Sequence, residues 1–232
     1  MRSAVLREAE ILRELRHPHI VSFRDMGESD GYLYFAMDYI RGQDAGAVVK
    51  QQGPMAVARA VALTCQLLEA LEYAHAKRFV HRDIKPSNLL LYEENGRELV
   101  KLADFGLARV YQASKLSGLT MEGHVGGTPC FMAPEQLLSI RDAPPSSDQY
   151  AAAATLYYLL TGKFVYDMPR DIYLVFAKIL NEEPVPIKKR RADVPTELAE
   201  AIHHGLQRNQ EKRFPDVARF RQALESLTRL GT

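Results

Sequence analysis

The sequence predicts an α+β protein in which one helix and two strands precede a mainly helical remainder. Residues 4–16 place their apolar side chains on one helical stripe. The runs 19–26 and 32–40 have strand-like composition on either side of the turn 27–31, and the pattern becomes largely helical after the letters RGQDAG at 41–46. With 232 residues, the chain can form one large domain or two modest ones.

The predicted helix 4–16 carries an acidic residue on its apolar stripe. Glu8 lies three residues after Val5 and four before Leu12, so the three side chains share one face. Because an unpaired buried carboxylate is costly, Glu8 needs a partner. The alternative is that Glu8 lies at the edge of the stripe, with its carboxylate in water.

Five further helices are predicted from apolar periodicity and capping residues. They cover residues 56–76, 147–161, 170–181, 195–207 and 215–228. Ser147 is the expected N-cap of the second, and Gly162 is its expected C-cap. Three short strand-like runs lie between the first two helices, at residues 79–83, 88–92 and 99–104. The letters EENG at 93–96 predict a hairpin turn between the last two runs.

Composition and charge exclude several classes of function. The formal charge of +1, from 30 basic and 29 acidic residues, does not indicate binding to nucleic acid or membranes. The basic run KKRR at 188–191 is expected in a solvated loop, with a docking patch as the alternative. The longest apolar run, 150–160, is too short to cross a bilayer, and no signal peptide opens the chain. Cys65 and Cys130 form no CxxC pair, which favours a reducing, cytoplasmic compartment.

Four polar residues near the middle of the chain suit phosphoryl transfer. That reaction needs a carboxylate to orient and deprotonate the attacking hydroxyl, a cation near the moving phosphoryl group, and oxygen ligands for magnesium. Asp83 suits the first role, Lys85 the second, and Asn88 with Asp104 the third. The alternative is that these residues are charged positions in surface turns.

The same residues belong to four motifs that occur in order: His81-Arg82-Asp83, Ile84-Lys85-Pro86-Ser87-Asn88, Asp104-Phe105-Gly106 and Ala133-Pro134-Glu135. The set resembles the signature motifs of protein kinases, whereas any one tripeptide alone is a weak signal. The resemblance covers nearly the whole chain. It implies a protein-kinase-like fold, ATP and Mg²⁺ as cofactors, and a protein substrate.

The resemblance also assigns residues to the nucleotide. Met37 matches the gatekeeper position, Asp38 to Ile40 match the hinge whose backbone binds adenine, and Leu90 matches the residue under the adenine ring. Asp104 is implied for both nucleotide and metal, and Asn88 for the metal alone.

Other matched positions are structural or regulatory. Glu8 matches the helix-C glutamate that pairs with a strand lysine, and Asp148 matches the aspartate that binds the backbone of the catalytic loop. Asp148 also reads as an ordinary acidic residue at a helix N-terminus. Glu135 and Arg213 match an ion pair at the end of the activation segment. The positions of the regulatory spine, a stack of side chains through both lobes, are matched by Leu12, Phe23, His81 and Phe105. The alternative is that these four are ordinary core residues.

The substrate class follows from Lys85 and from the letters GTPCFMAPE at 127–135, which are similar to those of Ser/Thr kinases. Thr128 is implied to bridge Asp83 and Lys85. Together with REAxxLxxLxHPxIV near the start, this pattern looks most like that of bacterial Ser/Thr kinases.

The segment between Gly106 and Ala133 resembles an activation loop. Arg82 marks the kinase type in which a phosphorylated loop residue pairs with the catalytic-loop arginine. Thr120 is the expected site of self-phosphorylation, ahead of Ser114 and Ser117. A merely flexible loop is the alternative.

Two positions depart from the family pattern without touching the chemistry. Ala153 stands where a helix glycine is common, and alanine suits a helix interior. Asn209-Gln210 replaces an Asp-Pro pair ahead of Arg213, and Asn209 can still cap the turn that follows.

A larger departure lies at the N-terminus. Kinases place a glycine-rich phosphate loop and a strand lysine ahead of helix C, and the residues before Glu8 contain neither. We therefore expect a truncated N-lobe at 1–40, with helix C and two strands, and a C-lobe at 41–232. Glu8 should then turn to solvent or pair with Arg82 or another cation. The strand 32–40 should present an open edge that favours self-association.

The sequence thus predicts a Ser/Thr protein kinase catalytic domain that binds ATP and turns over weakly as given. One alternative is a catalytically impaired kinase-like scaffold that binds partners without transferring phosphate. Another is a small-molecule kinase of related fold, such as an antibiotic phosphotransferase. The APE motif with Arg213, and the GTP letters ahead of it, favour a protein substrate over this last class.

Overall fold

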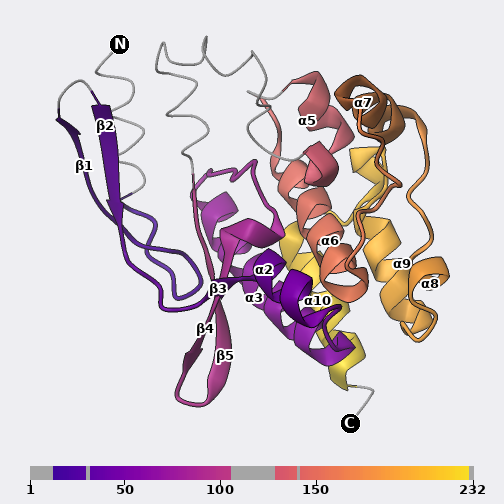
Figure 1. Cartoon of the computed structure of the whole chain (residues 1–232), viewed down its shortest axis with the longest axis horizontal. Helices are drawn as coiled ribbons and strands as arrows, with labels where there is room; N and C mark the ends of the chain where they lie inside the picture. The colour runs from indigo at the N-terminus through magenta and orange to yellow at the C-terminus, as the bar shows by residue number, and fades with distance from the viewer. Residues whose placement is uncertain (1–12, 30–31, 106–128, 140–141, 230–232) are drawn as a thin grey trace.

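The computed structural model describes residues 13–29, 32–105, 129–139 and 142–229. Several residues singled out above lie outside the described residues, as does most of the predicted helix 4–16: Glu8, Leu12, Ser114, Ser117, Thr120 and Thr128. Within these ranges the chain forms two small antiparallel sheets and a body of helices (Figure 1).

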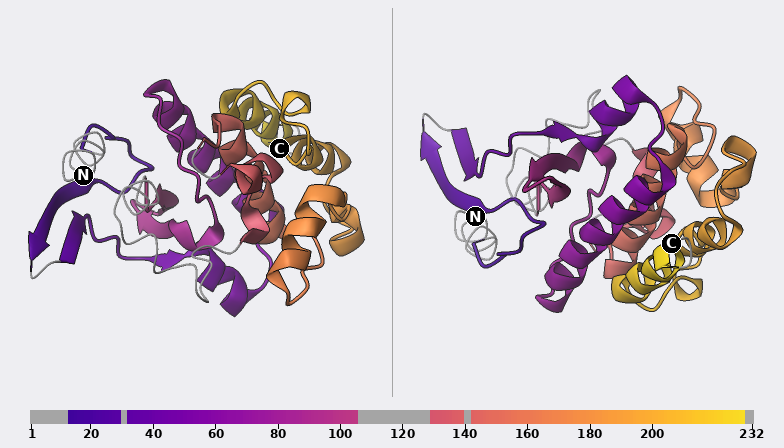
Figure 2. Two further views of the ribbon diagram at one scale, coloured as in Figure 1. Left: turned by 90° about the horizontal axis from the view of Figure 1, so that it is seen from above. Right: turned by 90° about the horizontal axis from the view of Figure 1, so that it is seen from below.

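The first sheet is a hairpin of β1 (Phe23–Ser29) and β2 (Tyr32–Met37). It lies to one side of the helical body in all three views (Figures 1 and 2). The second sheet has the order β3–β4–β5, with β3 at Gln43–Asp44, β4 at Leu89–Glu94 and β5 at Arg97–Leu102. The turn between β4 and β5 is confirmed, because Asn95 and Gly96 both adopt the positive φ, 53° and 71°, that such a hairpin needs.

The helices are α2 (Ala45–Gln52), α3 (Val57–Ala76), α5 (Pro134–Leu138), α6 (Pro145–Thr161), α7 (Ile172–Asn181), α8 (Ile187–Arg190), α9 (Thr196–Gly205) and α10 (Val217–Arg229). The five helices predicted from residue 56 onward are confirmed to within about two residues at each end. Gly162 ends α6 in the left-handed conformation, as expected.

Two local predictions were wrong. Ser147 is not the N-cap of α6, because the helix begins earlier, behind Pro144, and the Ser147 hydroxyl instead donates to Glu135. Residues 79–83 form no strand, since Arg82 adopts a positive φ of 68° that no strand allows. Helix α2 lies in the stretch expected to be largely helical, although no separate helix was predicted there; its N-cap Asp44 accepts a hydrogen bond from the Ala47 amide, and Gly53 ends it.

The basic run at 188–191 is also different from the expectation of a solvated loop. Arg191 donates through Nη1 to the backbone oxygens of Met55 and Leu160, at 2.6 and 3.0 Å. Arg190 donates to the Tyr157 hydroxyl and to Asp167. The two arginines thus bind α8 to the rest of the helical body, and only the lysines of the run remain exposed.

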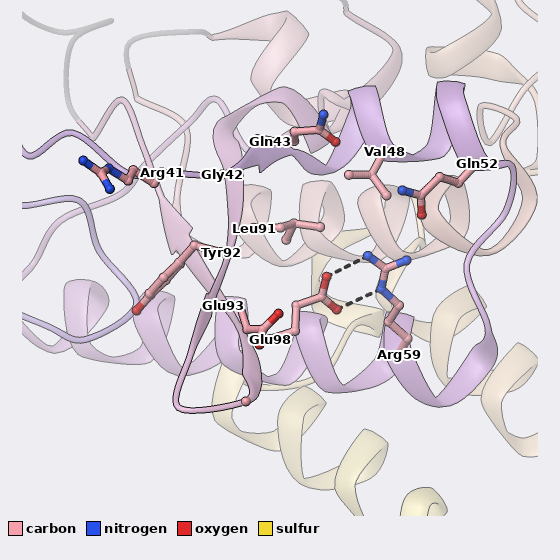
Figure 3. A pocket seen from close by; sticks show the side chains of 11 residues that line it. Arg41, Gly42, Gln43, Val48, Gln52, Arg59, Leu91, Tyr92, Glu93 and Glu98 are labelled. Atoms are coloured by element: carbon pink, nitrogen blue, oxygen red, sulfur yellow. Dashed lines mark hydrogen bonds and ion pairs between the residues drawn. The ribbon is translucent and has the colours of Figure 1, made fainter.

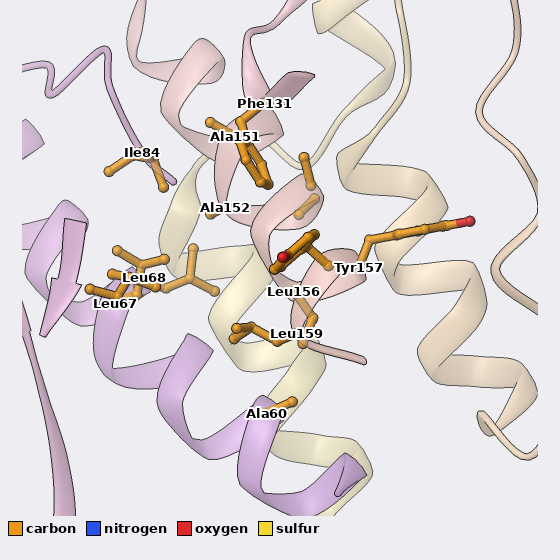
Figure 4. Close-up of a cluster of buried hydrophobic side chains, with 14 of the residues drawn as sticks. Ala60, Leu67, Leu68, Ile84, Phe131, Ala151, Ala152, Leu156, Tyr157 and Leu159 are labelled. Atoms are coloured by element: carbon orange, nitrogen blue, oxygen red, sulfur yellow. The ribbon is translucent and has the colours of Figure 1, made fainter. Parts of the chain in front are cut away.

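The hydrophobic core surrounds α6. Every residue of this helix from Ser147 to Thr161 is buried, which explains the unbroken apolar run at 150–160 as a core helix. Helix α3 packs on one side of α6 and α9 on another, and α10 covers α3 (Figure 4). Among the described residues, no helix is both long and apolar enough to span a membrane.

Candidate active site

The loop between α3 and β4 carries Asp83, Lys85 and Asn88, and Asp148 from the first turn of α6 binds its backbone. The two carboxylate oxygens of Asp148 accept hydrogen bonds from the amides of His81 and Arg82, both at 2.8 Å. Arg82 adopts the left-handed backbone region, which costs a non-glycine residue about 1–3 kcal/mol. The two bonds hold the chain in this conformation just before Asp83.

Asp148 is fully buried and has a third partner. The ring nitrogen Nε2 of His75, at the end of α3, lies 2.8 Å from its Oδ2. Burial acts to raise the pKa of Asp148, but the hydrogen bond from His75 and the positive potential of the two histidines outweigh it and lower that pKa. The carboxylate therefore stays charged, and it fixes α3, α6 and the loop to one another.

Lys85 and Asn88 converge on Asp83. The Lys85 ammonium donates to both carboxylate oxygens of Asp83, at 3.0 and 2.7 Å. The Asn88 amide donates to the Asp83 carboxylate at 3.1 Å and to its backbone oxygen at 2.8 Å. Because Asn88 uses its nitrogen in this way, its side-chain oxygen remains as the group that can face a metal.

Asp104 follows β5 and belongs to a segment that is bonded to the catalytic loop. The Ala103 amide donates to the Asn88 backbone oxygen at 2.8 Å, and Asp104 itself has a positive φ of 62°. The next residue, Phe105, packs edge-on against the His81 ring with a centroid distance of 4.5 Å. The structure thus places the segment of Asp104 beside the residue expected to share its metal.

The residues expected to bind the nucleotide lie at the end of β2, in the segment after it, on β4 and just after β5. Met37 and Phe23 line a small cavity together with Asp104 and Phe105, between the hairpin and the end of β5. The Asp38 amide donates to the Ser22 backbone oxygen, while its carboxylate pairs with Arg24. The segment through Ile40 leads into β3, which pairs with β4 at Leu90.

A cavity of about 510 Å³ lies elsewhere, between α2, α3 and the β4–β5 hairpin (Figure 3). Val48 and Leu91 form its apolar part, and the ion pair of Arg59 with Glu98 forms one wall. None of the predicted site residues lines it.

A family model for the protein kinase domain matches residues 1–226, which is nearly the full chain and includes Asp83, Lys85, Asn88 and Asp104. The chain belongs to this family. Its sequence is of the bacterial Ser/Thr kinase type.

Among curated relatives of this kinase domain is the serine/threonine-protein kinase pkn3 of Myxococcus xanthus, 34% identical over 227 residues, which are 95% of this chain and 41% of that protein. PknD of Mycobacterium tuberculosis is 37% identical over 213 residues, which are 92% of this chain and 31% of that protein. The chain therefore spans less than half the length of these relatives.

Solved structures agree on the fold. The kinase domain of Mycobacterium tuberculosis PknI is 28% identical, with a TM-score of 0.73, and the match covers 97% of this chain and 78% of that one. Rad53 in complex with AMP-PNP is 24% identical, with a TM-score of 0.78, and covers 95% of this chain and 54% of that one. The second likeness supports the fold alone.

Within the kinase domain, Glu135 and Arg213 form a two-pronged ion pair. The Arg213 nitrogens lie 2.6 and 2.8 Å from the two Glu135 oxygens, and the arginine side chain is fully buried. Burial acts to raise the pKa of Glu135, but the hydrogen bond and charge of Arg213 outweigh it and lower that pKa. Arg213 also donates to the backbone oxygens of Ser146 and Gln207, so it joins α5 to the start of α6 and the turn before α10.

Sequence reasoning missed two residues of this site. His75 binds Asp148 from the last turn of α3, and Gln136, next to Glu135, donates to the Arg82 backbone oxygen. His75 belongs to no motif, whereas Gln136 is the last letter of the GTPxxMAPEQ pattern that pointed to bacterial Ser/Thr kinases. That pattern assigned no role to Gln136.

Proposed function

We propose that this kinase domain transfers the γ-phosphoryl group of ATP to serine or threonine hydroxyls of a protein substrate. The convergence of Lys85 and Asn88 on the Asp83 carboxylate supports it most. That carboxylate is held in place on two sides, yet the Asp83 side chain remains 31% exposed. It can therefore be reached by a hydroxyl group from solvent, which a purely structural ion pair would not require.

In this proposal Asp83 orients the substrate hydroxyl and accepts its proton. The hydroxyl oxygen forms a bond to the γ-phosphorus as the bond from that phosphorus to the bridging oxygen breaks, and ADP leaves. Lys85, already beside Asp83, neutralises charge on the transferred group. Thr128 is proposed to bridge these two residues, and Thr120, once phosphorylated, to pair with Arg82.

The nucleotide and metal are assigned by donor chemistry. Asn88 and Asp104 offer one amide and one carboxylate oxygen, and hard oxygen donors in small number fit Mg²⁺. When bound, magnesium neutralises and orients the phosphates. The proposed adenine contacts are the backbone at Asp38 and Ile40 and the side chains of Met37 and Leu90.

Transfer of radiolabelled phosphate from ATP to a generic substrate such as casein tests the function. The wild-type chain should transfer phosphate to serine and threonine residues of the substrate. Asp83→Asn keeps the shape of the side chain and should lower the rate by about 10²–10⁴-fold. Equal rates for the two proteins would refute the function.

We further propose that the hairpin supports self-association. Tyr32 and Tyr34 on one side of β2, Met37 on the other and Tyr39 just after the strand expose 79, 49, 38 and 86% of their surface. Within the described residues β2 pairs with β1 alone, and its other edge is proposed to pair with a second copy of the chain. Sedimentation velocity over a concentration series tests this proposal.

A cytoplasmic location is likewise proposed, from two cysteines that form no disulfide in the structure.

A further inference from the structure

Gln136 makes a buried contact with the catalytic loop, a role that its place in the GTPxxMAPEQ pattern did not indicate. It lies in α5, exposes 2% of its surface, and donates from Nε2 to the Arg82 backbone oxygen at 2.5 Å. With Asp83 and Lys85 it lines one small cavity. A side chain from the helix after the activation segment therefore touches the residue directly before Asp83.

The contact acts on the peptide unit that leads into Asp83. The carbonyl of this unit, on Arg82, accepts from Gln136, and its N–H, on Asp83, donates to Nδ1 of His81 at 3.2 Å. The preceding N–H, on Arg82, is bound by Asp148. Because Arg82 has a positive φ, its conformation persists only while such contacts outweigh the alternatives. Of the three, only the Gln136 contact comes from the activation-segment side.

We propose that Gln136 is a positioning residue for Asp83, which it holds through the Arg82 carbonyl in the orientation that phosphoryl transfer needs. This inference rests on the function proposed for Asp83. The neighbouring Glu135 fixes α5 to the helical body through Arg213, so two adjacent side chains of α5 bind it in two directions. A shift of α5 would then reach Asp83 by way of one hydrogen bond.

Gln149 supplies a matched control for the burial of a glutamine. It exposes 1% of its surface, and its amide bonds the backbone N–H and oxygen of Phe214, at 3.1 and 3.0 Å. Neither bond reaches the catalytic loop. Loss of either glutamine should lower stability, but only loss of Gln136 should act on Asp83.

The first experiment compares Gln136→Met with Gln149→Met, since methionine keeps the volume and removes the donor. Gln136→Met should lower kcat by about 10–100-fold, as expected for a misplaced catalytic group, with KM for ATP changed less than about twofold. It should also speed amide hydrogen exchange at residues 81–85. Gln149→Met should leave kcat and the hydrogen exchange of residues 81–85 unchanged when both are measured well below the melting temperature of the variant.

A second variant gives a pH signature that lost stability alone would not. In Gln136→Glu a carboxylate faces the Arg82 carbonyl and cannot donate until it is protonated. The ratio of its kcat to that of the wild type should therefore rise as pH falls from 8 to 6. Gln149→Glu should show no such rise in its own ratio.

The outcomes separate the two proposals. A Gln136→Met enzyme with wild-type kcat, beside an inactive Asp83→Asn enzyme, overturns the positioning role and keeps the function. Equal losses of kcat in the Gln136 and Gln149 variants, with a flat pH ratio, also overturn it. If the wild type shows no Asp83-dependent transfer, the proposed function is wrong. Hydrogen exchange then still tests the contact: unchanged exchange at residues 81–85 in Gln136→Met would mean that Gln136 does not restrain the loop.

Discussion

The β1–β2 hairpin and the catalytic loop are held to the molecule in different ways. The hairpin carries surface ion pairs, such as Arg13 with Asp25, and several of its large apolar side chains face solvent. The catalytic loop is bonded to a fully buried carboxylate, Asp148, in a core helix. The loop that carries Asp83 is thus anchored directly to the core, whereas the hairpin that carries Met37 packs mostly outside the core.

One of the two connections between the hairpin and the body, the segment before β1, lies beside β5. Val21 donates to the Leu102 backbone oxygen and Leu102 donates to that of His19, both at 2.9 Å. Ile20, between them, is 1% exposed and belongs to the core. Stability measurements on the whole chain should therefore report on the helical body far more than on the hairpin.

The largest expected effect is at the buried ion pair. Glu135→Gln leaves the Arg213 guanidinium buried without a full negative partner and should cost about 3–5 kcal/mol of unfolding free energy at pH 7. Because the folded-state pKa of Glu135 lies below its ordinary 4.5, the pair's contribution is complete above that pH and is lost as pH falls through the lowered value.

Urea unfolding of both proteins at pH 7, 5, 4 and 3.5 measures this dependence. The stability gap between wild type and Glu135→Gln should be constant from pH 7 to 5 and should narrow below. Asp167→Asn, which alters an exposed ion pair with Arg190, is the control and should show little change at any pH. A gap that stays constant down to pH 3.5 would show that the charge of Glu135 is not what stabilises the fold.

A smaller effect is expected where α6 crosses α9. A Cβ added at Gly205 would lie 2.9 Å from the Cβ of Ala153, which is closer than two non-bonded carbon atoms approach in folded proteins. Gly205→Ala should therefore cost about 1–3 kcal/mol through overpacking. Ala153→Gly removes the opposing methyl group, so the double variant should cost less than the sum of the two single changes.

The control for this pair is Ala152, which is equally buried on the same helix but is not the neighbour of Gly205. Combining Ala152→Gly with Gly205→Ala should give additive costs in urea unfolding. Additivity for Ala153 as well would mean that the close approach is not the reason glycine stands at 205. The pair also explains how alanine is tolerated where the family commonly has glycine: the space is provided by the partner helix.

What could be predicted from sequence was what depends on periodicity and on linked motifs. The long helices α3 and α6 and the β4–β5 turn follow from local patterns, and the kinase fold follows from four motifs in order. The contacts of Asp148 with the loop, and of Glu135 with Arg213, are present in the structure. Their functional roles, like those of the nucleotide-binding residues, remain predictions.

What could not be predicted depends on tertiary partners. His75 and Gln136 are ordinary polar residues until the fold brings a buried carboxylate or carbonyl to them. Arg191 reads as part of a solvated basic run, because the two backbone oxygens that it binds are far away in sequence. Serine is a favoured N-cap residue, but α6 begins two residues before Ser147, with Pro144 as its N-cap and Pro145 as its first residue.

The smallest effect on stability is expected at the hairpin, and it sharpens the comparison most. Replacing both Tyr32 and Tyr39 with serine should change the unfolding free energy by no more than about 0.5 kcal/mol, because the two side chains are 79 and 86% exposed. The same variant should sediment as a monomer at concentrations where the wild type associates. Tyr173→Ser, on α7 and 78% exposed, is the matched control and should leave association unchanged. A large loss of stability in the hairpin variant would instead mean that the hairpin folds as part of the core, and that the two regions are held alike.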